Sequence, residues 1–173
     1  KAELLGCDAV VVNGFECAGH PGQNDTTSLI LAQKAANTLN IPVIAAGGFS
    51  TGKSLLAALA LGAQGIQMGT RFLLSEEVIV HEKVKRHLIH MQEDDTILVK
   101  RSIGKDARVW KSERATELAD IEAKPNVMIE DILPYISGES YRKLIKEGDL
   151  RSGVIALGQA IGLIDEIKPV NAM

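Results

Sequence analysis

The first part of the chain repeats one pattern of hydrophobic and polar positions. Short apolar runs over residues 8–13, 41–46 and 63–68 predict three strands, and the first two read as buried on both faces. Apolar residues at helical spacing predict helices over residues 29–39 and 52–61. Strands that alternate with helices in this order are typical of a parallel sheet with crossover helices, so we expect an α/β fold.

Turn and capping residues fit these boundaries. Asp25 or Thr26 is placed to cap the first helix, and Ser50 or Thr51 the second. Pro42 stands at the start of its strand, where no ladder donor is lost. Both helices are therefore expected to begin close to these polar residues.

The pattern becomes mostly helical after the third strand. The predicted helices cover residues 76–91, 113–123, 127–146 and 153–167. The third of them is expected to break near Pro134 or Gly138, and residues 97–110 predict a strand or extended arm. We therefore expect two parts: βα units over residues 1–75, and a mostly helical appendage over residues 76–173 that packs on them.

Composition and charge narrow the class of protein. Of 173 residues, 46% are hydrophobic and 3% aromatic, and 19 Lys and Arg against 22 Asp and Glu give a net charge of −3. A chain of this kind can bury a core, and it lacks the basic excess and the aromatics of a nucleic-acid binder. Its longest apolar stretch is far shorter than a membrane span. Two cysteines, Cys7 and Cys17, are too few for a disulfide framework or a zinc cage, which favours reduced thiols in a cytoplasmic protein.

Candidate chemistry lies where the predicted strands end. In parallel α/β proteins, ligands bind beyond the carboxyl ends of the strands. These ends carry Asn13-Gly14, Gly47-Gly48 and Gln67-Met68-Gly69-Thr70. Glycines there let a ligand approach the backbone and leave N–H groups free for a phosphate, although they could equally serve only as tight turns. No Walker or Gly-x-Gly-x-x-Gly motif is present, which disfavours nucleotide binding of those kinds.

His20 is the candidate general base. It lies in the loop after the first strand between small residues and Pro21, and an imidazole titrates near neutrality. A structural role, or a thiol–imidazole pair with Cys17, is the alternative. The other histidines, His81, His87 and His90, lack partners at ligand spacing, so they are expected on the surface and no metal site is expected.

Four segments, in order, resemble the nitronate monooxygenase family, formerly the 2-nitropropane dioxygenases. They cover residues 13–22, 41–48, 58–63 and 67–72. Flavin-dependent enoyl-acyl-carrier-protein reductases are relatives of this family. The resemblance implies a TIM (β/α)8 barrel, of which this chain would hold the last three parallel strands and a helical C-terminal appendage. Because the chain begins at Lys1 in the middle of such a pattern, we expect it to be truncated at its N-terminus.

The resemblance also implies FMN as cofactor and His20 as the catalytic base beside the flavin ring. The cofactor-binding residues would be Asn13, Ala18, Gly19, Gly47, Gly48, Gln67, Met68, Gly69 and Thr70. Gly48 and residues 67–70 would hold the FMN phosphate. Asn13 stands where the family often has glutamine, and Ala18 where many members have glycine.

The implied reaction is the oxidation of alkyl nitronates or nitroalkanes by O2 to a carbonyl compound and nitrite. Residues 15–22 also resemble a branch of NAD(P)H:quinone reductases, in which a quinone takes the electrons. A third interpretation is a non-catalytic remnant or assembly module. The expected partners are small molecules, namely nitronate and O2 or NAD(P)H and quinone, without nucleic acid or membrane, and an oligomer is left open.

Overall fold

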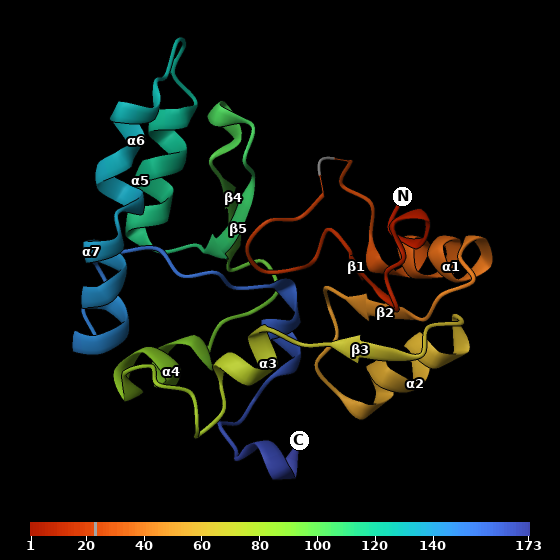
Figure 1. Ribbon diagram of the computed structural model, residues 1–173. Coiled ribbons are helices and arrows are strands. Elements are labelled where there is room, and N and C mark those ends of the chain that lie inside the picture. The colour runs from red at the N-terminus through yellow and green to blue at the C-terminus, as the bar shows by residue number, and fades with distance from the viewer. Residues whose placement is uncertain (23) are drawn as a thin grey trace.

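The computed structural model describes residues 1–22 and 24–173 and contains one parallel and one antiparallel sheet (Figure 1). The parallel sheet has the order β1-β2-β3, formed by β1 (Val10–Asn13), β2 (Val43–Ala46) and β3 (Gly65–Gln67). Helices α1 (Ser28–Thr38) and α2 (Gly52–Ala60) connect consecutive strands. The predicted α/β class with a parallel sheet is thereby confirmed.

The register of this sheet brings its three strand ends to one rim. Asn13 of β1 is the partner of Ala46 of β2, and Ala46 is in turn the partner of Gln67 of β3. Because the strands are parallel, the residues that follow each of them lie side by side beyond this rim. The three glycine-containing loops that the sequence singles out therefore meet at one edge of the sheet.

Burial differs between the strands. Val43, Ala45 and Ala46 of β2 are almost fully buried, whereas Val11 of β1 is 45% exposed. The prediction that the first strand is buried on both faces is wrong for the described residues, because among them β1 is an edge strand that pairs with β2 alone. Ala32, Ala45, Phe49, Ala58 and Ala63 form the small core between the sheet and its two helices.

The backbone N–H groups at the start of α1 and of α2 find their hydrogen-bond acceptors in different ways. Thr51 caps α2 as predicted, since its side chain accepts a hydrogen bond from the N–H of Ser54. The prediction for α1 is wrong, because this helix begins after Thr27 and neither Asp25 nor Thr26 caps it. The carboxylate of Glu16 accepts the Ser28 N–H instead, at 2.9 Å, and so supplies a negative group at the helix N-terminus.

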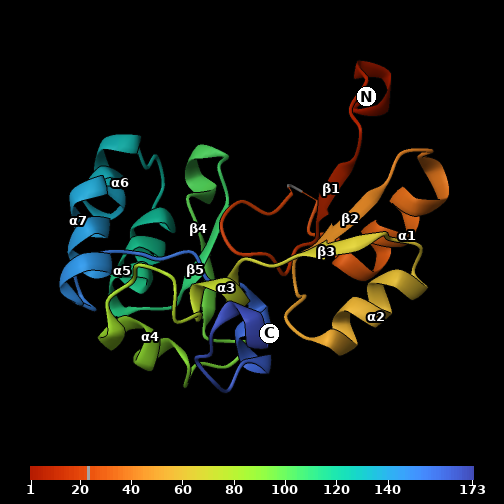
Figure 2. The same ribbon diagram turned by 60° about the horizontal axis from the view of Figure 1, so that its bottom comes forward.

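The remainder of the chain surrounds a β-hairpin (Figure 2). The hairpin is formed by β4 (Thr96–Val99) and β5 (Ala107–Trp110). The helical elements of this part of the chain are α3 (Thr70–Leu73), α4 (Glu82–Leu88), α5 (Glu113–Glu122), α6 (Ile129–Ile136), α7 (Gly138–Arg142), a π-helical turn (Lys143–Glu147) and a 3-10 turn (Gln159–Leu163). Further 3-10 turns cover Glu3–Leu5, Arg101–Ile103 and Val170–Ala172. The predicted arm over residues 97–110 is this antiparallel hairpin, and the predicted break near Gly138 falls between α6 and α7.

Two predicted helices are wrong in extent or in kind. The helix expected over residues 76–91 is confined to α4, because Glu76 N–H donates to the carbonyl of Lys168 and His81 caps the helix. The helix expected over residues 153–167 is an extended segment followed by a 3-10 turn. Tertiary hydrogen bonds hold that segment, one of them from Trp110 N–H to the carbonyl of Ile155. Among the described residues, no helix is long and apolar enough to cross a membrane.

Candidate functional site

A cavity of about 130 Å³ lies at the rim where the three parallel strands end. Among the predicted cofactor residues, those that line it are Asn13, Ala18, Gly47, Gly48, Gln67, Gly69 and Thr70. They come from the last residues of β1 and β3 and from the segments that follow β1, β2 and β3, so the sheet register brings together residues that lie far apart in the sequence. Gly19 and Met68 lie in the same loops but outside this lining.

The two glycines after β2 have different roles. Both are in the left-handed region, with φ of +87° at Gly47 and +82° at Gly48. A Cβ on Gly47 would lie 2.8 Å from the carbonyl oxygen of Gly14. The backbones of the two loops approach so closely here that only glycine fits. A Cβ on Gly48 would meet Glu16 only at 3.5 Å, an ordinary contact. Packing therefore fixes Gly47, whereas at Gly48 the positive φ favours glycine and the surrounding atoms leave room for a Cβ.

Backbone donors at this rim are available to a ligand. Within residues 1–22 and 24–173, no hydrogen bond is donated by the backbone N–H groups of Gly48, Gly69 or Thr70. Unpaired N–H groups at strand ends and in left-handed turns form concavities that bind anions. The donor chemistry of the cavity thus suits a phosphate group.

The C-terminal segment closes the cavity, which the sequence analysis missed. The N–H of Gly158 donates to the Thr70 hydroxyl at 2.9 Å, and Gln159 N–H donates to the carbonyl of Glu16 at 3.0 Å. Gly158 and Ala160 line the cavity. A Cβ on Gly158 would lie 3.0 Å from both Ala18 N and the Glu16 carbonyl oxygen, tighter than most Cβ contacts, so this close approach favours glycine. The only signal in the sequence was the glycine itself, since its contact partners are remote along the chain.

Four further lining residues were not predicted: Glu16, Cys17, Ala46 and Phe49. The carboxylate of Glu16 is already bound by Ser28, whose N–H and hydroxyl both donate to it. Burial raises the pKa of the Cys17 thiol, which keeps it protonated at neutral pH. The Cys17 thiol is therefore neutral, whereas the Glu16 carboxylate is held against the start of α1 by Ser28.

His20 lies at the surface, outside the cavity lining. Its Nε2 atom is 3.1 Å from the Nζ atom of Lys100, which follows β4. Its loop nevertheless contributes Ala18 to the cavity wall two residues earlier. The role of His20 as a base stays a prediction.

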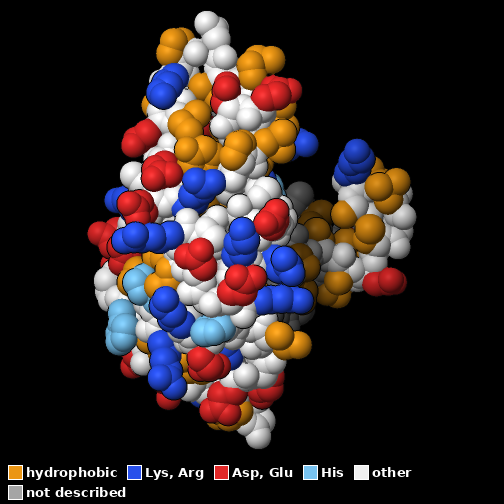
Figure 3. Space-filling model, turned by 90° about the vertical axis from the view of Figure 1, so that its left-hand side faces the viewer, with side chains coloured by type: hydrophobic (Ala, Val, Ile, Leu, Met, Phe, Trp, Pro, Cys, Tyr) orange, Lys and Arg blue, Asp and Glu red, His pale blue; other side chains and the backbone are white. Residues whose placement is uncertain are grey.

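The other histidines lie on a different face, on and beside α4, where Figure 3 shows them among Lys and Arg side chains. The Nδ1 atom of His81 accepts the N–H of Lys83 as the helix cap. His87 packs edge-on against the buried ring of Trp110, with 4.8 Å between the ring centroids. Among the described residues, no three His, Cys, Asp or Glu side chains are grouped so as to hold a metal ion.

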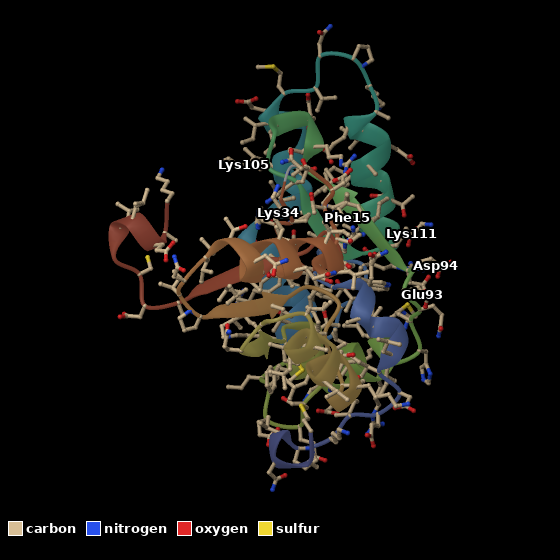
Figure 4. The ribbon with its side chains drawn as sticks, turned by 90° about the vertical axis from the view of Figure 1, so that its right-hand side faces the viewer. Phe15, Lys34, Glu93, Asp94, Lys105 and Lys111 are labelled. Carbon is tan, nitrogen blue, oxygen red and sulfur yellow. The ribbon has the colours of Figure 1, made fainter. Side chains whose placement is uncertain are left out.

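A second, wider hollow of about 480 Å³ adjoins the cavity and shares Glu16, Gly48, Phe49 and Ala160 with it. It extends past α2 to Glu93, which Figure 4 shows beside the C-terminal segment. The strand-end cavity thus opens into space large enough for more than a phosphate group.

The sequence profile of the nitronate monooxygenase family matches residues 1–173. The chain belongs to this family. It is 40% identical to FabK from Thermotoga maritima, with a TM-score of 0.89, over 99% of this chain and 53% of that one. It is 41% identical to a probable nitronate monooxygenase of Staphylococcus haemolyticus over 61% of this chain and 32% of that protein.

A further relative is named for a different reaction. The chain is 32% identical to (3aS,4S,5R,7aS)-5-hydroxy-7a-methyl-1-oxo-octahydro-1H-indene-4-carboxyl-CoA dehydrogenase of Rhodococcus jostii, over 96% of this chain and 57% of that protein. By their names, the monooxygenase and the dehydrogenase are oxidoreductases. The nitronate monooxygenase match covers the whole chain, and the chain spans about half the length of FabK and of this dehydrogenase.

Proposed function

We propose that the full-length protein binds FMN at this rim and oxidises alkyl nitronates or nitroalkanes with O2 to a carbonyl compound and nitrite. The observation that carries the proposal is the strand-end cavity with unpaired backbone donors, in a chain of the nitronate monooxygenase family.

The residues present fit the phosphate of FMN. In this proposal the N–H groups of Gly48, Gly69 and Thr70 hold the phosphate oxygens, and Asn13 and Ala18 lie toward the flavin. The Glu16 carboxylate is held against the start of α1 by the Ser28 N–H and hydroxyl, so its negative charge is directed at that helix. The flavin, when bound, supplies the redox chemistry between substrate and oxygen.

The residues of this chain transfer the proton and position the reacting groups. His20 takes the proton from the carbon next to the nitro group of a neutral nitroalkane, a step that a preformed nitronate does not need. The hydrogen bond from Gly158 to Thr70 fixes the wall on the phosphate side. On the flavin side, the small side chain of Ala18 leaves room for the ring.

We also propose that the parallel sheet is the last part of a (β/α)8 barrel. Residues 1–75 would form its C-terminal βα units, and residues 76–173 would pack on them as an appendage. Among the described residues, β1 and β3 each have one unpaired edge, and a barrel removes such edges by closing the sheet. The exposed Leu29 and Leu56 on the outer helices offer apolar surface for further elements.

The test uses the full-length protein mixed with FMN and freed of excess by gel filtration. A yellow protein that releases nitrite from nitronate under air supports the proposal. Faster turnover of NADH and a quinone than of any nitronate would instead assign it to the quinone-reductase branch, which the sequence of residues 15–22 also resembles. A colourless, inactive protein would overturn both assignments and favour a non-catalytic role.

A further inference from the structure

Arg108 of β5 ties the loop after β1 to the hairpin through both its backbone and its side chain. The backbones of Gly19 and Arg108 exchange both hydrogen bonds: Gly19 N–H donates to the Arg108 carbonyl at 3.0 Å, and Arg108 N–H donates to the Gly19 carbonyl at 2.6 Å. This contact extends the hairpin by one short antiparallel bridge. The loop therefore cannot move at Gly19 without breaking a pair of bonds to β5.

The side chain of Arg108 holds the other end of the same loop. Its Nε and Nη2 atoms both donate to the carbonyl of Phe15, at 3.2 and 3.0 Å, and its Nη1 atom donates to the Thr96 hydroxyl at 3.1 Å. The centre of the guanidinium lies 4.4 Å from the centroid of the Phe15 ring, a cation–π contact. Figure 4 shows Phe15 between the parallel sheet and the hairpin.

The burial of this cation points to a geometric role. The Arg108 residue is 4% exposed, and among the described residues no carboxylate lies within ion-pair distance of it. Burial lowers the pKa of its guanidinium, which nevertheless stays charged at neutral pH because an arginine pKa starts so high. Burying a charge costs free energy unless polar contacts compensate for it. The Phe15 carbonyl, the Thr96 hydroxyl and the Phe15 ring supply these contacts, so the guanidinium is stable only in a narrow range of positions.

We propose that Arg108 is a positioning residue of the candidate site. It clamps residues 15–19 at both ends, and between the clamped ends lie Glu16, Cys17 and Ala18, which line the cavity. The clamp also positions His20, and the importance of that position for catalysis rests on the proposed function. The clamp itself follows from contacts within this chain and does not depend on that proposal.

The experiment compares Arg108→Met and Arg108→Lys with a matched control, Arg114→Met. The guanidinium of Arg114 also stacks on a ring, 3.9 Å from that of Tyr135, and donates to a carbonyl, that of Pro134, but it lies outside the cavity lining. Amide hydrogen exchange of residues 15–20 is measured on full-length protein without FMN. Exchange should rise about tenfold in Arg108→Met, partly return in Arg108→Lys, and stay unchanged in the control.

A second readout uses the FMN-loaded enzyme. Arg108→Met should lose more turnover with neutral nitroalkane than with preformed nitronate, because only the former needs His20 in place. Unchanged loop exchange in Arg108→Met, or an equal rise in Arg114→Met, would overturn the clamp. If wild type oxidises no nitronate, the proposed function fails while loop exchange still decides the clamp.

A milder variant keeps the proposal testable if Arg108→Met does not fold. Phe15→Leu removes only the ring under the guanidinium and keeps the charge and the carbonyl acceptor. Faster exchange of residues 16–20 in this variant supports the clamp, and exchange equal to that of wild type contradicts it.

Discussion

The ammonium of Lys100 lies 3.1 Å from the Nε2 atom of His20. Lys100 has a left-handed backbone, with φ of +63°, and its N–H donates to the carboxylate of Glu122 on α5 at 2.6 Å. A charged lysine can only donate, so Nε2 accepts, and the neutral ring carries its proton on Nδ1. The hairpin thus sets the tautomer of the ring, and Nε2 can accept a substrate proton only when the ammonium of Lys100 moves away from it.

Replacing Lys100 by Met should allow the His20 ring to adopt the other tautomer as well. Without the ammonium, Nε2 is free to carry the proton, so the neutral ring becomes a mixture of the two forms. The ¹⁵N chemical shifts of the neutral His20 ring report the change. Lys105→Met, on the same hairpin (Figure 4), is the control and should leave the shifts as in wild type. Identical ring shifts in Lys100→Met and wild type would contradict the assignment.

His20→Asn should separate the two substrates of the proposed reaction. We expect the full-length protein to keep its flavin, because the phosphate donors lie on other loops. Turnover of neutral nitroalkane should fall by about 10²–10⁴-fold, the usual effect of losing a general base. Turnover of preformed nitronate should fall far less. Equal losses on both substrates would assign His20 a structural role.

Gly48→Val should weaken FMN binding sharply in the full-length protein. The new side chain would stand where the phosphate approaches, and a β-branched residue disfavours φ of +82°. Flavin retained after gel filtration measures the effect. Gly104→Val is the matched control, since Gly104 also has a positive φ, +66°, and a Cβ there meets no described atom within 4 Å. Equal retention in both variants would argue against a phosphate at this loop.

Glu16→Gln should destabilise the fold by about 1 kcal/mol, because a neutral amide replaces the carboxylate that accepts the Ser28 N–H and hydroxyl. The midpoint of urea unfolding, at unchanged slope, measures this loss. Glu113→Gln, in the first turn of α5, removes an exposed carboxylate and should change the midpoint much less. A shift of the same size in both variants would show that Glu16 has no special capping role.

The two cysteines should react at very different rates. Cys7 is exposed, whereas Cys17 is buried with a raised pKa, so a smaller fraction of Cys17 is thiolate at any given pH. Alkylation at pH 7.5, followed by mass spectrometry, should label Cys7 first, and labelling of Cys17 should require a higher pH or unfolding. Rapid labelling of Cys17 in the folded protein would contradict this burial.

Local sequence determines the βα units of this protein. Apolar runs ended by glycine specify β1, β2 and β3, helical spacing specifies α1 and α2, and Thr51 specifies where α2 begins. Parallel order then brings the three loops to one rim, because each connection returns the chain in the same direction. Much of the candidate cavity follows from these periodicities, since Gly47, Gly48 and Gly69 stand just after β2 and β3.

The remaining parts of the site depend on partners far apart in the sequence. Gly158 pairs with Thr70, Arg108 with Phe15 and Gly19, and the helix expected over residues 153–167 is replaced by an extended segment that reaches the cavity. Periodicity describes only neighbours along the chain, whereas these hydrogen bonds form only after the hairpin and the C-terminal segment have packed against the sheet. The tertiary structure therefore decided which residues close the cavity and what holds the loop that carries His20.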